Sequence, residues 1–537
     1  MAAMTAPSAP PSAFLESRSP TTGEPLGTVP RADEGAVHAA VADAARTQPV
    51  WAALPLADRA RYMRRAAQVV IDAMDELAVL IAREHGKPVG EAAALELLPM
   101  VDSLHWIADH GPRLLRDERV RTRQVYLLGK RHRHVREPLG VVAVICSSSR
   151  PWAEPFLQTA IALMCGNAVV VKPAPEAALV GARVEQALAR AGVPEGAVRV
   201  IQGDDEVGEA LAQADGVAKV FFTGSQEAGR RVEAACSRLA RPAVLELGGK
   251  DPQLVLADAR LDDAVAGTLW GAFSGSGQAS AAIERVYVAR ELAEVFLERL
   301  VDRTRALRLG DPLAPDTDIG PLVSASRGER VRAVLDDAVA RGARLHCGGP
   351  IVVEGLERAW FLAPAVVTDV PPRARLVLEP VPGPIVTVTA VDSEDEAVAL
   401  ANDSPFGLGA SVWTRDRARG ERIARRLEAG MTWVNDHRYS HSAVQTAWGG
   451  AKASGTGRVH GEPGFRECVE IKLVASGAAR AARRPWGLPY DRSLRGAAEA
   501  AARVLYGRDE DRVPALRAGA GPLARLGGRL VRGALRR

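Results

Sequence analysis

Apolar residues recur at three- and four-residue spacing from about Asp33 to His110, which predicts amphipathic helices. The runs AVHAAVADAA and RARYMRRAAQVVIDAMDELAVLIAREH carry this pattern, and Gly86, followed by Lys87 and Pro88, supplies a helix stop. The next run, VRTRQVYLLGKRHRHV, alternates apolar and polar residues and places its basic side chains on one face. We therefore predict an opening layer of helices followed by an exposed β-hairpin, which is a candidate oligomer contact.

Between Gly140 and Gly249, short β-branched runs alternate with Ala-rich helical stretches; the strand-like runs are VVAVI, AVVVK, VRVI, KVFFTG and AVLEL. This βαβ pattern predicts a parallel sheet with helices on both faces, an architecture typical of nucleotide-binding domains. From about Asp251 to Asn435 a second alternating region has strand-like runs at ERVYVA, AVVTDV, PIVTVTAV and MTWVN. The pattern thus predicts two α/β domains, although a fold of this kind does not by itself establish a function.

The last part of the chain, 477–537, changes composition to Ala, Gly and Arg. The runs PYDRSLRGAAEAAARVLYG and LARLGGRLVRGALRR predict two short basic amphipathic helices. In the second helix Leu523, Leu526, Leu530 and Ala534 form an apolar stripe with arginines around it, which is compatible with an anionic membrane surface. Packing on the body of the protein or on a partner subunit is the favoured alternative.

Composition places the chain among ordinary globular proteins. Its 537 residues are 47% hydrophobic and 25% charged, and this length predicts two to four domains. The formal net charge of +4 is small for such a chain and gives no argument for a nucleic-acid partner. The five cysteines are odd in number, far apart and never in C-x-x-C spacing, which predicts a reducing compartment and argues against a disulfide framework or a metal site.

The location of the protein is predicted from two features of its sequence, the N-terminal run and the most apolar stretch. The N-terminal run MAAMTAPSAPPSAF has no basic start followed by an apolar stretch, so it does not resemble a secretory signal. The most apolar stretch, 156–171, is interrupted by polar residues and suits a buried helix followed by a strand. We therefore expect a cytoplasmic protein with a loose N-terminal tail and no membrane span.

Two segments carry candidate chemistry. In GSQEAG, from Gly224 to Gly229, a glycine turn follows a strand and opens a helix, so backbone N–H groups and the positive helix end can face a pyrophosphate. A plain strand-to-helix turn is the alternative. Glu246 stands in a strand-like run immediately before Gly248 and Gly249. It is either a structural acid or a carboxyl group whose pKa is raised by burial so that it acts as a base near neutral pH.

Several segments, in order and at consistent spacing, resemble the aldehyde dehydrogenase superfamily over roughly residues 15 to 475. KVFFTGSQEAG is similar to the family's cofactor-phosphate loop, LELGGKDP to its general-base segment and SGSGQASAAIERVYV to its nucleophile segment. ANDSPFGLGASVWT, GMTWVND and AWGGAKASGTGR match structural motifs of the catalytic domain, and ECVEIKLV matches the final bridging strand. The resemblance implies an NAD(P)-dependent oxidoreductase near the succinate-semialdehyde dehydrogenase-like branch, and a homo-oligomer, either a dimer or a tetramer.

The fold implied is α/β, with a Rossmann-type cofactor domain, an α/β catalytic domain and a protruding oligomerisation hairpin. The domain boundaries expected from the resemblance are a flexible tail over 1–15, a dinucleotide-binding domain over 16–123 and 143–247, bridging strands over 124–142 and 469–476, a catalytic domain over 248–468, and a basic extension over 477–537.

The resemblance also assigns roles to single residues. Glu246 matches the general base. The residues implied to bind NAD or NADP are Trp152, Lys172, Gly224, Ser225, Gly229 and Leu247. For Trp152 a core aromatic is the alternative, and for Lys172 a solvated lysine at a strand end.

The chain departs from the family at the nucleophile. The family segment G-Q-x-C is here Gly277-Gln278-Ala279-Ser280, without a nearby cysteine. A thiol with a reference pKa of about 8.5 is partly ionised at neutral pH, whereas a serine hydroxyl needs a well-placed base. Ser280 is therefore either a weak nucleophile or a small filler.

Other positions that serve the reaction in the family also differ. Ala153, followed by Glu154, replaces the asparagine that donates to the developing oxyanion, and loss of one such donor typically costs a factor of about 100 to 1,000 in rate. Pro380 and Pro382 replace the Glu and Phe expected at the nicotinamide ribose and ring. Pro175 stands where NAD-preferring members often have Glu, so the choice between NAD and NADP stays open.

Three functions are compatible with this pattern. The first is NAD(P)-dependent oxidation of an aldehyde at a degenerate site with weak or lost activity. The second is a catalytically silent subunit that binds a nucleotide or pairs with an active relative. The third is an esterase that uses Ser280 with Glu246.

Overall fold

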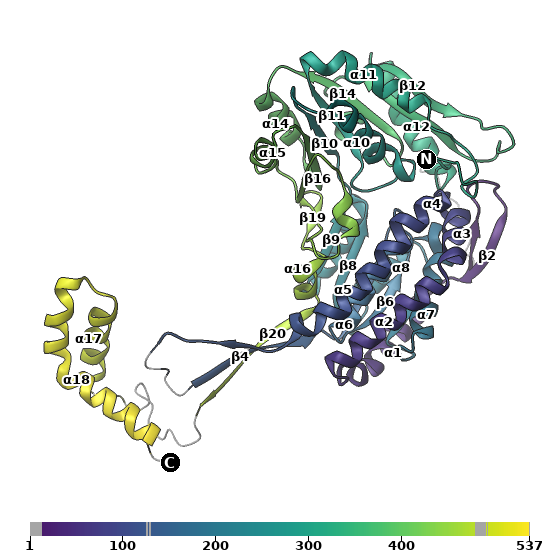
Figure 1. Cartoon of the computed structure of the whole chain (residues 1–537). Coiled ribbons are helices and arrows are strands. Elements are labelled where there is room, and N and C mark those ends of the chain that lie inside the picture. The colour runs from purple at the N-terminus through teal and green to yellow at the C-terminus, as the bar shows by residue number, and fades with distance from the viewer. Residues whose placement is uncertain (1–12, 125–126, 128–129, 478–489, 491, 536–537) are drawn as a thin grey trace, which may run out of the picture. The chain divides into compact units, whose positions relative to one another are not determined.

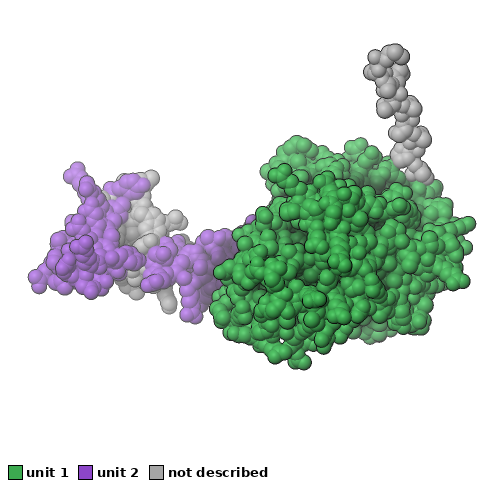
Figure 2. Space-filling model, turned by 90° about the horizontal axis from the view of Figure 1, so that it is seen from above, with its two compact units in different colours: residues 1–115, 138–469 green, residues 116–137, 470–537 purple. Residues whose placement is uncertain are grey.

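The computed structural model describes residues 13–124, 127, 130–477, 490 and 492–535. The chain divides into two compact units, one of residues 1–115 and 138–469 and one of residues 116–137 and 470–537 (Figures 1 and 2). The first unit contains the two predicted α/β sheets, and the second contains the predicted hairpin and the C-terminal helices.

The first unit opens with a short hairpin and the predicted layer of helices. The elements are β1 (Phe14–Arg18), β2 (Pro25–Pro30), α1 (Glu34–Ala52), α2 (Leu56–Asp72), α3 (Met74–His85), α4 (Val89–Ala92) and α5 (Leu98–Leu115). Asp33 caps α1 by accepting the N–H of Ala36, and Gly86 ends α3 with a φ of 81° that glycine adopts without strain. Because β1 begins at Phe14, it includes the end of the segment expected to be a tail; residues 1–12 lie outside the described part.

A six-stranded sheet forms the first α/β layer, and its strand order is β19-β9-β8-β5-β6-β7. Its strands are β5 (Val141–Ile145), β6 (Ala168–Lys172), β7 (Val198–Val200), β8 (Val217–Gly224), β9 (Ala243–Leu247) and β19 (Gly455–Thr456). β5 to β9 pair in parallel, and β19 joins antiparallel to β9. The five strands predicted from β-branched runs are thus confirmed.

Helices cover both faces of this sheet. The helices are α6 (Ala153–Met164), α7 (Ala178–Arg190), α8 (Asp205–Gln213) and α9 (Gln226–Arg238). α6 and α7 pack on one face with α2 and α5 behind them, whereas α1, α8 and α9 pack on the other. The apolar stretch 156–171 is a buried helix followed by a buried strand, as predicted.

A seven-stranded sheet forms the second layer, in the order β12-β13-β14-β11-β10-β16-β17. Its strands are β10 (Asp251–Val255), β11 (Ile283–Ala289), β12 (Arg344–Ile351), β13 (Phe361–Thr368), β14 (Ile385–Val391), β16 (Gly409–Trp413) and β17 (Met431–Val434). Its helices are α10 (Leu261–Phe273), α11 (Arg290–Arg305), α12 (Ala325–Ala340), α13 (Arg375–Leu378), α14 (Glu394–Asn402) and α15 (Arg417–Ala424). The remaining elements of this unit are β15 (Phe406–Gly407), β18 (Ala451–Lys452) and α16 (Gly461–Glu467).

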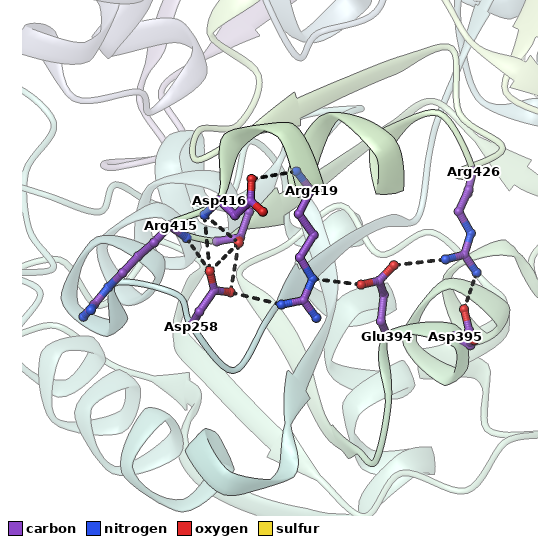
Figure 3. A network of polar contacts seen from close by, with 8 residues as sticks. Asp258, Glu394, Asp395, Arg415, Asp416, Arg419 and Arg426 are labelled. Atoms are coloured by element: carbon purple, nitrogen blue, oxygen red, sulfur yellow. Dashed lines mark hydrogen bonds and ion pairs between the residues drawn. The ribbon is translucent and has the colours of Figure 1, made fainter.

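Apolar side chains assign these helices to faces. α10 and α11 pack with Val286 and Val388, while α14 and α15 pack with Leu254 and Tyr287 on the opposite face. A polar network also ties α14 and α15 to the sheet (Figure 3). There the Asp258 carboxylate accepts the Thr414 hydroxyl at 2.8 Å, and arginines of the α15 region donate to acids of α14.

The second unit contains a three-stranded sheet in the order β20-β4-β3. Its elements are β3 (Glu118–Val120), β4 (Lys130–Pro138), β20 (Val469–Gly477), α17 (Leu494–Tyr506) and α18 (Asp509–Leu535). β3 and β4 pair antiparallel, which confirms the predicted hairpin.

The second C-terminal helix is longer than the short helix predicted from LARLGGRLVRGALRR. α18 spans 27 residues because it begins at Asp509, well before the predicted run, and continues through Pro514 and Pro522. Of the predicted apolar stripe, the side chains of Leu526, Leu530 and Ala534 lie outside the described residues. No helix in the described ranges is both long enough and apolar enough to cross a membrane.

Candidate active site

The predicted phosphate loop is a strand-to-helix turn that opens onto a cavity. β8 ends at Gly224, and Ser225 caps α9 by accepting the N–H of Ala228 at 3.2 Å. Gly224 and Ser225 both line a cavity of about 570 Å³, which we call the cofactor-side cleft. The first N–H groups of a helix lack intrahelical acceptors and carry partial positive charge, so this turn presents an anion-binding surface.

Close packing explains why two positions of the turn are glycine. A Cβ at Gly224 would lie 2.5 Å from the ring of Phe222, and a Cβ at Gly229 would lie 2.5 Å from a methyl of Leu247. Leu247 does not line the cleft, and its N–H donates to Ser454 at 3.0 Å. Gly229 and Leu247 thus meet as helix and strand packing partners, and direct contact of either with a cofactor stays a prediction.

Three cations line the same cleft, and one of them, Arg231, pairs with Asp205 and Glu209. Lys172 is the last residue of β6 and is 3% exposed, and burial lowers its pKa. Arg327, from the first turn of α12, donates to Ser148 Oγ at 3.4 Å. Sequence patterns did not single out Arg327, because no local signal distinguishes it from the other arginines of SASRGERVR. Lys172 and Arg327 are cations that can pair with an anionic group of a ligand. The cleft is also lined by acids, which are Glu176, Asp204, Asp205, Glu206 and Glu209.

A second cavity of about 490 Å³ adjoins the cofactor-side cleft; it is lined by Ser280, and we call it the reaction-side cleft. Thr223, Gly224, Ser225 and Arg327 line both cavities. The structure thereby places four of the predicted site residues around two adjoining cavities; these are Lys172, Gly224, Ser225 and Ser280.

Ser280 is positioned by a tight glycine-rich turn. Gly275 and Ser276 both have positive φ, at 63° and 56°, in the 3-10 segment that follows α10. The Ser280 carbonyl accepts the N–H of Gly249 at 2.9 Å, which fixes the serine backbone beside the end of β9. Within the described residues, neither the Ser280 hydroxyl nor its N–H has a hydrogen-bond partner, so the side chain has no base in contact.

The substituted prolines occupy the same space. Pro380 and Pro382 line the reaction-side cleft together with Ser280. Their rigid rings have no side-chain donors or acceptors, so they can contact a ligand but cannot form a side-chain hydrogen bond with it.

Glu246 does not face the cleft that contains Ser280. Its side chain lines a separate cavity of about 20 Å³, which we call the inner cavity, together with Glu154, Cys146, His441 and His460. The reason is the two-residue period of β9, which sends Leu245 and Leu247 into one core and Glu246 to the other face. The expected pairing of Glu246 with Ser280 is therefore not seen in the structure.

Burial shapes the acid–base chemistry of the inner cavity. Burial raises the pKa of Glu154 to about 7, although the hydroxyls of Thr223 and Ser147 oppose this rise by donating to it. Burial, and then the neighbouring Glu154, raise the pKa of Glu246 well above its usual range. Burial lowers the pKa of His460 to about 3, so this imidazole is neutral at physiological pH. The raised pKa of Glu246 agrees with the acid–base role expected for it.

Trp152 is part of the core. Its side chain is fully buried, stacks on Phe156 with ring centroids 4.7 Å apart, and lines neither cleft. The core-aromatic alternative matches this placement, and contact of the indole with a cofactor has no support in the geometry. The N–H groups of Trp152 and Ala153 donate to Glu96 at 3.0 and 3.1 Å, and Glu96 forms a buried ion pair with Lys87.

The fold and this cleft define a two-sheet α/β protein with an anion-binding turn at one end of the cleft and a serine at the other. Residues 7–474 match the model of the aldehyde dehydrogenase family, so the chain belongs to that family.

Similar proteins cover most of the chain. A betaine aldehyde dehydrogenase of Cereibacter sphaeroides is 37% identical over 459 residues, which are 85% of this chain and 92% of that protein. One of Vibrio vulnificus is 35% identical over 456 residues, with the same coverage of each chain. These relatives do not test the expected proximity to the semialdehyde-oxidising branch, which stays a prediction.

Solved structures give the same result for the fold. A putative aldehyde dehydrogenase from Burkholderia cenocepacia has a TM-score of 0.82 at 32% identity and covers 86% of this chain and 94% of its own. The NAD+ complex of an aldehyde dehydrogenase from Bacillus cereus has a TM-score of 0.83 at 30% identity and covers 86% and 93%. The predicted α/β fold is confirmed.

Proposed function

We propose that this chain binds NAD(P) in the cleft and oxidises an aldehyde to the carboxylic acid, slowly, because a serine hydroxyl stands at the nucleophile position. One observation carries the proposal: the cavity lined by Lys172 and the cavity lined by Ser280 adjoin at Gly224 and Ser225, which line both. The family, and the NAD+ complex of the Bacillus cereus neighbour, support the choice of cofactor.

The residues present fit a dinucleotide. The first turn of α9 would hold the pyrophosphate through Ser225 and the N–H groups beside it, and Lys172 and Arg327 would contribute positive charge. Gly224 leaves the approach to this turn free of a side chain. When bound, the nicotinamide ring supplies the hydride acceptor.

The chain's own groups then define the chemistry. The Ser280 hydroxyl adds its oxygen to the aldehyde carbon and releases its proton to solvent water, and the free N–H of Ser280 is available to the developing oxyanion. The carbon–hydrogen bond of the former aldehyde group then breaks, and the hydrogen leaves with the electron pair as hydride. An ester of Ser280 remains. Water then cleaves the ester to release the acid and restore the hydroxyl. Each addition is slow, because no described base contacts Ser280.

Calorimetry with NAD+ and NADP+ tests cofactor binding, and an aldehyde panel that includes betaine aldehyde tests turnover. We expect saturable binding, weak NAD(P)H formation by the wild type, and a clear gain in Ser280→Cys. Ser326→Cys is the matched control, because Ser326 lines the same cleft and only contacts Ser324. Absence of binding for both nucleotides would refute the proposal.

A silent subunit is the second candidate. The observation in its favour is that Ser280, Pro380 and Pro382, which line the reaction-side cleft, and the buried Ala153 all depart from the family segments, whereas the anion-binding turn is present. It predicts nucleotide binding by the wild type without any aldehyde-dependent NAD(P)H formation. Steady NAD(P)H formation by the purified wild type would discard it.

The esterase ranks last. It needs Glu246 next to Ser280, whereas the two side chains line different cavities. Mass spectrometry after incubation with an activated ester should show no acyl adduct on Ser280, and an adduct there would revive this function.

We also propose the expected assembly and location. A homo-oligomer built through β4 and β20 accords with the exposed side chains along β20, and a cytoplasmic site accords with the free cysteines. The division into dinucleotide-binding, catalytic and bridging domains is likewise our proposal, supported by the two separate sheets of the first unit.

A further inference from the structure

The inner cavity brings two carboxyl groups from different elements together. Glu154 reaches it from the first turn of α6, and Glu246 reaches it from β9. A volume of about 20 Å³ suits a single water molecule, which needs about 10 to 15 Å³ and two to four polar partners. His441 and His460 supply further polar atoms on its wall.

No described cation forms an ion pair with either carboxyl group. The charges near Glu154 are Arg150 and Glu96, and those near Glu246 are Glu154, Arg150 and Arg458. Arg150 donates to the Leu95 carbonyl at 3.3 Å, and Arg458 donates to two backbone carbonyls, so both guanidinium groups have other partners.

The other titratable groups on the wall do not neutralise the pair either. Burial keeps both imidazoles, His441 and His460, neutral at physiological pH, and it keeps the Cys146 thiol protonated. Arg150 favours the ionised form of both acids, but burial is the larger influence on each and raises both pKa values, which disfavours double ionisation.

Hydroxyl groups distinguish the two acids. Ser147 Oγ donates to Glu154 at 3.1 Å and lies 2.9 Å from Ser149 Oγ, and Thr223 also donates to Glu154. Glu246 accepts a single side-chain hydrogen bond, from the indole N–H of Trp448. Donors stabilise the ionised form of a carboxyl group, so the negative charge is favoured on Glu154.

We propose that Glu154 is a positioning residue for Glu246: the two carboxyls share one proton near neutral pH, and Glu246 is the one that keeps it. Glu246 is then an acid rather than a base at the pH where the cleft works. Its role in the reaction rests on the proposed function, but the shared proton exists whether or not the protein turns over an aldehyde. When a base removes the shared proton, Glu154 and Glu246 are both ionised and the pair carries two negative charges.

Infrared difference spectra of the full-length protein test the shared proton directly, since protonated and ionised carboxyl groups absorb separately. The variants are Glu154→Gln and Glu246→Gln, each titrated across neutral pH. We expect Glu154→Gln to lower the ionisation midpoint of Glu246 by about one pH unit or more, because the ionised neighbour has been removed. Glu246→Gln should change the midpoint of Glu154 little, because Glu246 is still protonated while Glu154 ionises. If Glu154→Gln leaves the titration of Glu246 unchanged, the proposal is wrong.

Ser147→Ala tests which acid keeps the proton. The loss of its donor should raise the ionisation midpoint of Glu154. Ser148→Ala is the matched control, because the adjacent serine contacts Arg327 and not Glu154. Equal titrations of the two serine variants would overturn the assignment of the charge to Glu154.

Thermal unfolding gives a second measurement that needs neither activity nor infrared assignment. The folded pKa of Glu154, about 7, lies above that of an unfolded glutamate, so the folded state binds more protons between the two values. The wild type therefore loses stability as pH rises through this interval. Glu154→Gln should lose less stability, because a glutamine side chain does not ionise. The Tm of the variant relative to the wild type should increase from about pH 5 to about pH 8; a constant difference would contradict the pair.

Discussion

The two ends of the cleft differ in how they are built. At the cofactor side, Gly224, Ser225 and the start of α9 offer backbone N–H groups, with Lys172 and Arg327 beside them. At the reaction side, the cleft presents Ser280, which has no base in contact, and two prolines.

The difference teaches which properties survive substitution. An anion-binding turn depends on the backbone and on a helix terminus, so the fold itself maintains it. Bond-making chemistry depends on single functional groups, and one changed side chain removes it. The structure accordingly has an anion-binding turn at one side and, at the other, a serine without a base in contact beside two prolines.

The largest expected effect is structural and concerns the buried start of α6. Glu96→Ala should lower the free energy of unfolding by about 3 to 5 kcal/mol, because it leaves Lys87 buried without its partner and the N–H groups of Trp152 and Ala153 without an acceptor. Denaturant unfolding measures this. Glu421→Ala, which breaks the exposed pair with Arg417, is the control and should cost less than about 1 kcal/mol.

The next effect concerns catalysis. Restoring the amide donor by Ala153→Asn in the Ser280→Cys background should raise kcat by a factor of about 100 to 1,000, since an oxyanion donor contributes that much. Steady-state NAD(P)H formation provides the readout. In the wild-type Ser280 background the same substitution should change little. A large gain there would mean that the hydroxyl is already an effective nucleophile.

Cofactor affinity should respond to charge at the other end of the cleft. Lys172→Met should weaken NAD(P) binding about 10- to 100-fold, the usual contribution of a hydrogen bond from a charged group. Calorimetry compares it with Lys472→Met, whose lysine pairs with Glu137 in the second unit. Unchanged affinity in Lys172→Met would remove this residue from the binding end.

The smallest effect separates capping from binding. Ser225→Ala and Ser393→Ala each remove a helix cap and should each cost about 1 kcal/mol of stability. Ser225→Ala alone should also reduce NAD(P) affinity, because Ser393 caps α14 outside the cleft. Equal affinities of the two variants would show that the cap of α9 only stabilises its helix.

Local sequence patterns determined the elements of the fold and one end of the site. Buried parallel strands such as AVVVK are continuous apolar runs, and the turn after KVFFTG follows from its glycine and the serine cap. These features depend on neighbouring residues, so a single sequence can predict them.

Only the tertiary structure decided which side chains meet. Arg327 reaches the cleft from α12, far along the chain from Gly224, and the alternation of β9 places Glu246 beside Glu154 rather than beside Ser280. Such contacts depend on how separate elements pack, and so does the burial that raises the pKa of both acids. The sequence determined that a serine stands in the nucleophile segment, and packing determined that no described acid or imidazole contacts it.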